Sequence, residues 1–162
     1  MHTDTRQYLI TAALAALALV LAAPVTAGFM FALFVPFIVV SMIYNVITAV
    51  RKPEKRRLSL IRIVVWLVVP AIVGAAHWRW YLAARADANI AVTAVTTFKA
   101  RTGTWPKTLQ DAGIQDPQFG RRWMLGYLLD ADRPFIAYAS TFALFDSYTY
   151  DFEAQRWEFH AD

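Results

Sequence analysis

The stretch TFKARTGTWPKTLQDAGI, residues 97–114, decides how the second half of the chain folds. It opens as the end of an amphipathic helix, and Gly103 stands where a left-handed residue terminates such a helix. Pro106 suits the first turn of a further helix, which we expect to run for two turns and stop at Gly113. The stretch therefore predicts a corner between a long helix and the segment that follows it.

Upstream of this corner, residues 81–101 keep the spacing of an amphipathic helix. Its apolar positions recur at intervals of three and four residues and form one stripe: Ala84, Ala88, Ala91, Val95 and Phe98. No strong helix breaker separates this segment from the apolar run before it. We therefore expect one long helix from near Ser59 to Thr102, with its outer stripe lying on a sheet.

Downstream of the corner, the sequence changes to short alternating runs bounded by turns. The four runs are residues 121–130, 133–141, 147–152 and 155–161. Consecutive strands with short turns predict an antiparallel meander of three or four strands. A domain of this size, residues 79–162, is small for a self-sufficient core, so we expect the long helix to be its main packing partner.

The first half of the chain has the composition of a membrane module, residues 1–78. Of all 162 residues 58% are hydrophobic and only 17% are charged, and no charged residue occurs from Gln7 through Val50. About 20 apolar residues span a bilayer core. We expect three transmembrane helices, at about residues 8–24, 27–50 and 58–78.

Positive charge is concentrated in the loop 51–62, whose net charge is +5. Its basic residues are Arg51, Lys52, Lys55, Arg56, Arg57 and Arg62. Short basic loops stay in the cytoplasm, which predicts a multi-pass protein of a bacterial inner membrane with residues 79–162 in the periplasm. The residues at the end of the third span are typical of a belt at the membrane interface: Trp78, Arg79, Trp80 and Tyr81. The outer domain has a net charge of −1, which argues against nucleic acid as a partner.

A second interpretation of the N-terminus stays open. Residues 1–27 resemble a signal peptide, with Arg6 before a hydrophobic run and small residues ending at Ala27. Cleavage there would leave the outer placement of the C-terminal domain unchanged. The chain has no cysteine, so no disulfide supports the exported domain.

The corner and the closing strands carry a family resemblance. Phe98, TGTWP at 102–106, Leu109 and the terminal YTYDFEAQRW at 148–157 resemble type IV pilins and type II secretion pseudopilins. The resemblance runs from near Leu58 to the end and implies a pilin-like helix packed on an antiparallel sheet. A prepilin leader motif is missing, since Leu33 stands where the family has a glutamate after Gly28-Phe29. The resemblance therefore implies a pilin-like domain on an uncleaved anchor, and not a filament subunit.

The residues needed for catalysis do not come together in the sequence. The three histidines, His2, His77 and His160, are too far apart for a metal cluster, and the acidic residues are spread over separate turns. No nucleophile has a partner base in a known motif, and there is no phosphate-binding loop. We expect neither enzymatic activity nor a cofactor or metal.

The surplus of aromatic residues after the corner points instead to protein recognition. The best candidates for contacting a partner are Arg121, Arg122, Trp123 and Tyr148, because aromatic and arginine side chains anchor interfaces. The preferred hypothesis is a non-catalytic accessory component of a type IV pilus or related secretion machine that contacts pilin-like partners. The alternative is a membrane-anchored immunity or inhibitor protein against a toxin acting in the periplasm or membrane.

Overall fold

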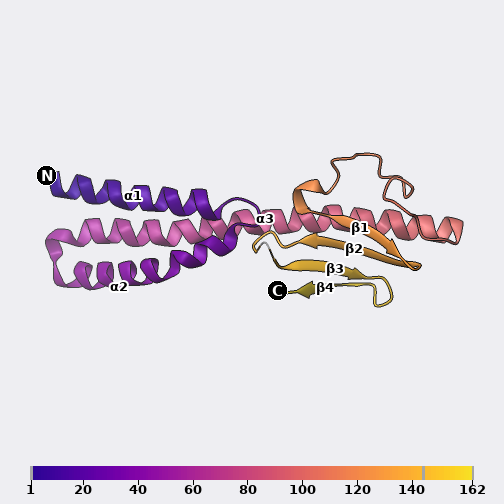
Figure 1. Cartoon of the computed structure of the whole chain (residues 1–162). Coiled ribbons are helices and arrows are strands. Elements are labelled where there is room, and N and C mark those ends of the chain that lie inside the picture. The colour runs from indigo at the N-terminus through magenta and orange to yellow at the C-terminus, as the bar shows by residue number, and fades with distance from the viewer. Residues whose placement is uncertain (1, 144, 162) are drawn as a thin grey trace. The chain divides into compact units, whose positions relative to one another are not determined.

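The computed structural model describes residues 2–143 and 145–161 and forms two compact units, Met1–Trp78 and Arg79–Asp162 (Figure 1). Helix α3, Arg56–Thr102, is continuous over 47 residues and contributes to both units. The predicted long helix is therefore confirmed, with its start three residues before Ser59. Pro70 lies inside it, which a helix in a membrane tolerates when neighbouring groups satisfy the freed backbone carbonyl.

The first unit is helical. Its elements are α1 (His2–Ala22), the 3-10 helix η1 (Gly28–Leu33), α2 (Val35–Arg51), the 3-10 helix η2 (Pro53–Lys55) and the beginning of α3. Two of these helices, α1 and α3, are long and apolar enough to cross a membrane. The apolar helix α2 is shorter, at 17 residues.

The prediction of one helix over residues 27–50 is wrong in its continuity. The structure has η1 and α2 instead, with Pro36 in the first turn of α2. Proline has no N–H to bond the carbonyl of the residue four positions earlier, and its ring clashes with that carbonyl. The α-helix therefore restarts at Val35, and the six residues before it form a tighter helix.

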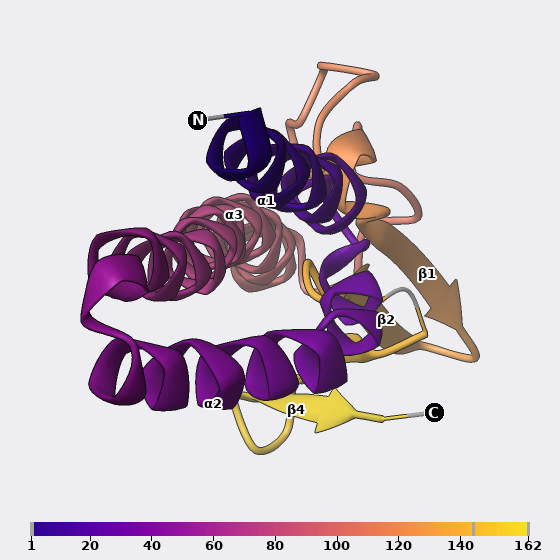
Figure 2. The same cartoon turned by 90° about the vertical axis from the view of Figure 1, so that its left-hand side faces the viewer.

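Figure 2 shows the helices of the first unit viewed from one end, and small side chains lie at one of their contacts. Ala15 and Ala18 of α1 form a buried cluster with Val69 of α3. Phe37 of α2 meets the buried Trp66 of α3 edge to face, with ring centroids 5.5 Å apart. Small residues at helix contacts are typical of packing inside membranes.

The second unit is an antiparallel meander packed on α3. The strands β1 (Gly126–Asp130), β2 (Arg133–Ala139), β3 (Ser147–Asp151) and β4 (Arg156–His160) pair in the order β1-β2-β3-β4. The predicted sheet is confirmed, but its first strand is shorter than residues 121–130. Gly120 and Met124, at φ 67° and φ 51°, bracket a 3-10 helix η3 (Arg121–Trp123), and these left-handed residues prevent an extended chain there.

The predicted stripe of α3 forms the core of this unit. Ala84, Ala88, Ala91 and Val95 are all fully buried. Phe98 is half-buried at the end of the stripe. Ile136 of β2 is fully buried and belongs to the same cluster as Ala91 and Val95. The alanines let the helix backbone approach the sheet closely, so the larger strand residues fill the space between them.

The corner after α3 contains turns, and the predicted helix from Pro106 to Gly113 is wrong. Gly103 does end α3 in the left-handed conformation, at φ 78°. Thr108 and Asp111 bond each other's backbone N–H through their side chains, at 3.2 and 3.0 Å. These bonds stabilise one turn, and Gly113 at φ 101° ends it before a second turn forms.

Aromatic side chains fill the rest of the space between helix and sheet. Tyr138 stacks on Tyr148 at 5.1 Å and meets Trp157 edge to face at the same distance. The Trp157 indole N–H donates to the Asn89 side-chain oxygen of α3 at 3.0 Å. Burial raises the pKa of Tyr138, and the Arg85 guanidinium only partly opposes that shift.

Tyr138 and Tyr127 allow a matched comparison, because removing the hydroxyl breaks a well-formed hydrogen bond at only one of the two positions. The Tyr138 hydroxyl is buried without a well-formed hydrogen bond among the described residues, whereas Tyr127 donates to the Pro106 carbonyl at 2.6 Å. We expect Tyr138→Phe to leave the free energy of unfolding unchanged or raise it by about 1 kcal/mol, and Tyr127→Phe to lower it by about 1 kcal/mol. Denaturant unfolding of the full chain in detergent measures both changes, and equal losses would contradict this assignment.

The raised pKa of Tyr138 also predicts how stability responds to pH. A tyrosine whose pKa is raised in the folded state stabilises that state below the ordinary pKa of 10.0, and this contribution is lost as the pH rises above it. Tyr138→Phe removes the ionisable hydroxyl, so the variant should lose less stability than the parent between pH 8 and pH 11. A parallel loss in both proteins would show that Tyr138 does not titrate in this range.

Candidate functional site

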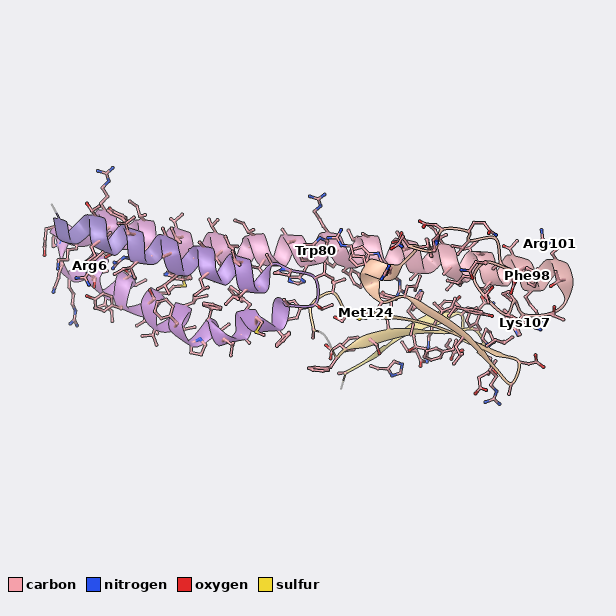
Figure 3. The ribbon with its side chains drawn as sticks, turned by 45° about the horizontal axis from the view of Figure 1, so that its top comes forward. Arg6, Trp80, Phe98, Arg101, Lys107 and Met124 are labelled. Carbon is pink, nitrogen blue, oxygen red and sulfur yellow. The ribbon has the colours of Figure 1, made fainter. Side chains whose placement is uncertain are left out.

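A groove of about 480 Å³ lies along α3 in the second unit. It is lined by Ala86, Asn89, Ile90, Thr93, Ala94, Thr97, Phe98 and Arg101 of the helix and by Ala112 of the corner. Phe98 and Arg101 lie near the end of α3 (Figure 3). We call this feature the α3 groove.

Two rows of side chains define the α3 groove. Residues 86, 90, 94 and 98 form one row, and residues 89, 93, 97 and 101 form the other, each with a spacing of four. Such rows are the ridges between which a second helix inserts its own ridge. Residues 86–101 extend over roughly 23 Å of helix, or about four turns.

The lining of the α3 groove is uncharged apart from Arg101 at one end. The Thr93 hydroxyl donates to the Asn89 backbone carbonyl at 2.8 Å, so this polar group is satisfied within α3. Ile90 is 53% exposed, which leaves a large apolar side chain at the centre of the row. These groups offer neither a nucleophile nor a base, and they suit packing against another apolar surface.

A second hollow, of about 400 Å³, lies where the hairpin turns meet Trp105. The Asp151 carboxylate in its lining accepts the backbone N–H groups of Glu153 at 2.8 Å and Ala154 at 2.9 Å. These hydrogen bonds lower the pKa of Asp151, because they favour the ionised form. The carboxylate therefore holds the β3–β4 turn, and among the described residues no group of three or more potential metal ligands is present.

The predicted partner contacts Arg121 and Arg122 lie on η3 and are exposed. The guanidinium of Arg122 lies 5.8 Å from the centre of the Trp80 ring and 5.0 Å from that of Trp123. Arg121 donates to the Gln118 side chain at 3.2 Å. Both arginines thus remain available at the surface.

Trp123 and Tyr148 lie inside the second unit. Trp123 is 5% exposed, and its indole N–H donates to Asp87 of α3 at 2.7 Å. Tyr148 faces the helix side of the sheet and contacts Tyr81 at a centroid distance of 5.9 Å, and burial raises its pKa. Both side chains therefore hold the sheet on α3.

The predicted membrane-interface residues fall into three groups. Exposed residues of the basic loop are Arg51, Lys52, Lys55, Arg56 and Arg57. Arg62 is half-buried and donates to the Gln7 carbonyl of α1 at 3.4 Å. Further along α3, Trp78 and Arg79 are exposed, while Trp80 and Tyr81 are half-buried.

The α3 groove was not predicted from the sequence, although a signal for it exists. Ala86, Ile90 and Ala94 form an apolar row beside the core stripe, on the side expected to face solvent. A residue as large as Ile90 among threonines and an asparagine is the mark of a second contact surface. The groove itself depends on Ala112, which the corner brings beside the helix.

The chain matches no family model, no curated protein and no solved structure.

Proposed function

We propose that the protein is a non-catalytic, membrane-anchored interaction protein that receives a helix of a pilin-like partner in the α3 groove. The α3 groove is the observation that carries this proposal. Its two ridges match the surface of a second helix, and its uncharged walls suit a partner stripe of small and apolar residues. Arg101 at one end favours a partner helix with a carboxylate at the matching position.

The first unit has apolar side chains outside and polar side chains inside, which is the reverse of a water-soluble protein and supports a membrane anchor. Val40 and Val50 are 67% and 78% exposed, whereas Asn45, Ser59 and His77 are at most 5% exposed. Apolar exteriors and polar interiors suit a lipid environment, because lipid chains solvate the outside and polar side chains find partners inside. The His77 ring lies 2.9 Å from the Ala22 carbonyl at the end of α1.

The proposal includes a topology. Three membrane spans, with the basic loop in the cytoplasm, leave the second unit in the periplasm of a bacterium, next to the inner membrane. Pilus and secretion machines assemble pilin-like proteins at this membrane, and an accessory component of such a machine fits the sequence resemblance. A reporter enzyme active only in the periplasm, fused after Asp162, tests the topology, and an inactive fusion would overturn it.

A groove-filling variant tests the partner. Ala94→Trp places a large ring in the α3 groove, and Leu128→Trp places the same ring on an exposed strand position that is already 61% accessible. After crosslinking in native membranes, we expect pilin-like or secretion components to be recovered with the parent and with Leu128→Trp. Recovery should fall at least about tenfold with Ala94→Trp, because loss of one helix ridge removes well over 1 kcal/mol of packing. Recovery of a toxin instead, or equal recovery from all three proteins, would overturn the proposal.

A further inference from the structure

The two ends of the sheet in the second unit differ in chemical character. One end holds the hairpin turns at residues 131–132 and 152–155, and we call it the turn end. At the opposite end lie the entry into β1 and the connection from β2 to β3, since Gly126 pairs with Ala137 and Ala139 pairs with Ser147. We call this the loop end. Its exposed residues include Arg121, Arg122, Met124, Phe142 and Phe145.

Large apolar side chains are exposed at the loop end. Met124 is 61% exposed, Phe142 is 49% and Phe145 is 69%. Met124 also adopts the left-handed conformation, at φ 51°, which costs a side chain more than it costs glycine. Two aromatic rings and a methionine on neighbouring loops form a surface that water solvates poorly.

Ring contacts with α3 fix the level of the loop end along that helix. Arg122 lies over the ring of Trp80, and Tyr148 at the start of β3 meets the ring of Tyr81. Figure 3 shows Trp80 and Met124 at one end of the second unit, and Phe98, Arg101 and Lys107 at the other. The loop end is therefore level with residues 80–81 of α3.

The apolar run of α3 ends at Ala76, four residues before Trp80. Four residues of α-helix rise by about 6 Å, and the headgroup layer on each side of a bilayer is roughly 5–8 Å deep. A helix that leaves the hydrocarbon at Ala76 thus carries Trp80, and the loops level with it, into the headgroups.

We propose that the loop end of the sheet rests on an anionic lipid bilayer. Phe142, Phe145 and Met124 enter the boundary between headgroups and chains, and Arg121 and Arg122 face the lipid phosphates. The residues 121–125 and 140–146 carry two arginines and a single acid, Asp146, which is half-buried. This contact rests on the proposed membrane anchor, and it would fix the orientation of the second unit over the bilayer.

The absence of cysteine makes a direct test possible. Single cysteines replacing Phe145 or Met124 carry an environment-sensitive fluorophore, and the full chain is reconstituted in vesicles of phosphatidylcholine with phosphatidylglycerol. Nitroxide-labelled headgroups should quench most of the emission at both positions. Lys107→Cys, at the turn end, is the matched control and should keep its emission.

Trp78→Cys separates failure of the contact from failure of the anchor. Quenching at 78 without quenching at 124 and 145 overturns the loop contact and leaves the membrane anchor standing. Absence of quenching at 78 overturns both. If the fluorophores at positions 124 and 145 are quenched as strongly as the one at position 78, the result supports the contact of the loop end with the bilayer.

The two arginines have a test of their own. Quenching at Phe145→Cys should weaken at least about twofold in pure phosphatidylcholine, because the anionic headgroups that attract Arg121 and Arg122 are missing. Arg121→Gln with Arg122→Gln should remove that lipid dependence. Equal quenching in both lipids for the parent would overturn the role assigned to the arginines.

Discussion

Replacing Ile136 by alanine should lower the free energy of unfolding by about 3 kcal/mol, within the range of roughly 2–5 kcal/mol for such core truncations. Ile136 is fully buried at the centre of the cluster that joins β2 to α3. Its neighbours across the helix are Ala91 and Val95, whose short side chains cannot move to fill the space left behind. The cavity therefore persists, and its cost adds to the lost burial.

Phe135→Ala is the control for this substitution. Phe135 precedes Ile136 on β2, points to the opposite face of the sheet and is 46% exposed. A unit of this size changes its melting temperature by about 4–8 °C per kcal/mol, so Ile136→Ala should shift it by more than about 10 °C. Thermal unfolding followed by near-ultraviolet circular dichroism measures both variants. A larger shift for Phe135→Ala would mean that the sheet packs α3 with its other face.

Gly120→Ala should be nearly as costly, at about 3 kcal/mol. A Cβ atom at this position would lie 2.5 Å from the Cβ of Leu125, and the backbone is left-handed at φ 67°. The left-handed conformation alone costs a side chain roughly 1–2 kcal/mol, and overpacking adds roughly 1–3 kcal/mol. Leu125 cannot easily retreat, because its N–H donates to the Gly120 carbonyl at 3.1 Å.

Gly103→Ala isolates the conformational part of that cost. Gly103 is also left-handed, at φ 78°, but no atom lies within 4 Å of the position of its Cβ. When both glycine variants are unfolded by denaturant, we expect Gly103→Ala to lose only about 1 kcal/mol. Equal losses at the two glycines would show that the contact with Leu125 relaxes freely. Restoration of Gly120→Ala by a second change, Leu125→Gly, which removes the Cβ that the new methyl group meets, would confirm the steric origin.

Local patterns predict the long helix and the strands well. The stripe from Ala84 to Val95 has the helical period, and the alternation of Tyr148, Tyr150, Trp157 and Phe159 has the period of strands. Each pattern shows which side of a helix or strand is buried, and it does not depend on which element packs against that side. Gly103 likewise marks the end of α3, because its left-handed conformation is a local property.

Features that depend on distant residues could not be predicted in this way. Trp123 looked like a surface anchor, yet its indole N–H meets Asp87, 36 positions earlier in the chain. The α3 groove requires the corner to return beside the helix. The predicted helix after Pro106 was wrong because Thr108 and Asp111 stabilise a single turn, which Gly113 ends in the left-handed conformation.

The order of the strands has a consequence for how the second unit is made. Each strand of the meander after β1 pairs with the strand before it in the sequence, and α3 precedes all four strands. As the chain is synthesised, α3 is complete before β1 emerges, and each later hairpin finds its partner already present. Folding can then proceed as sequential addition to a helical template, with short loops to close at each step. Strand pairings that are so close in sequence form quickly, so the exposed edge of an unfinished sheet is short-lived during biogenesis.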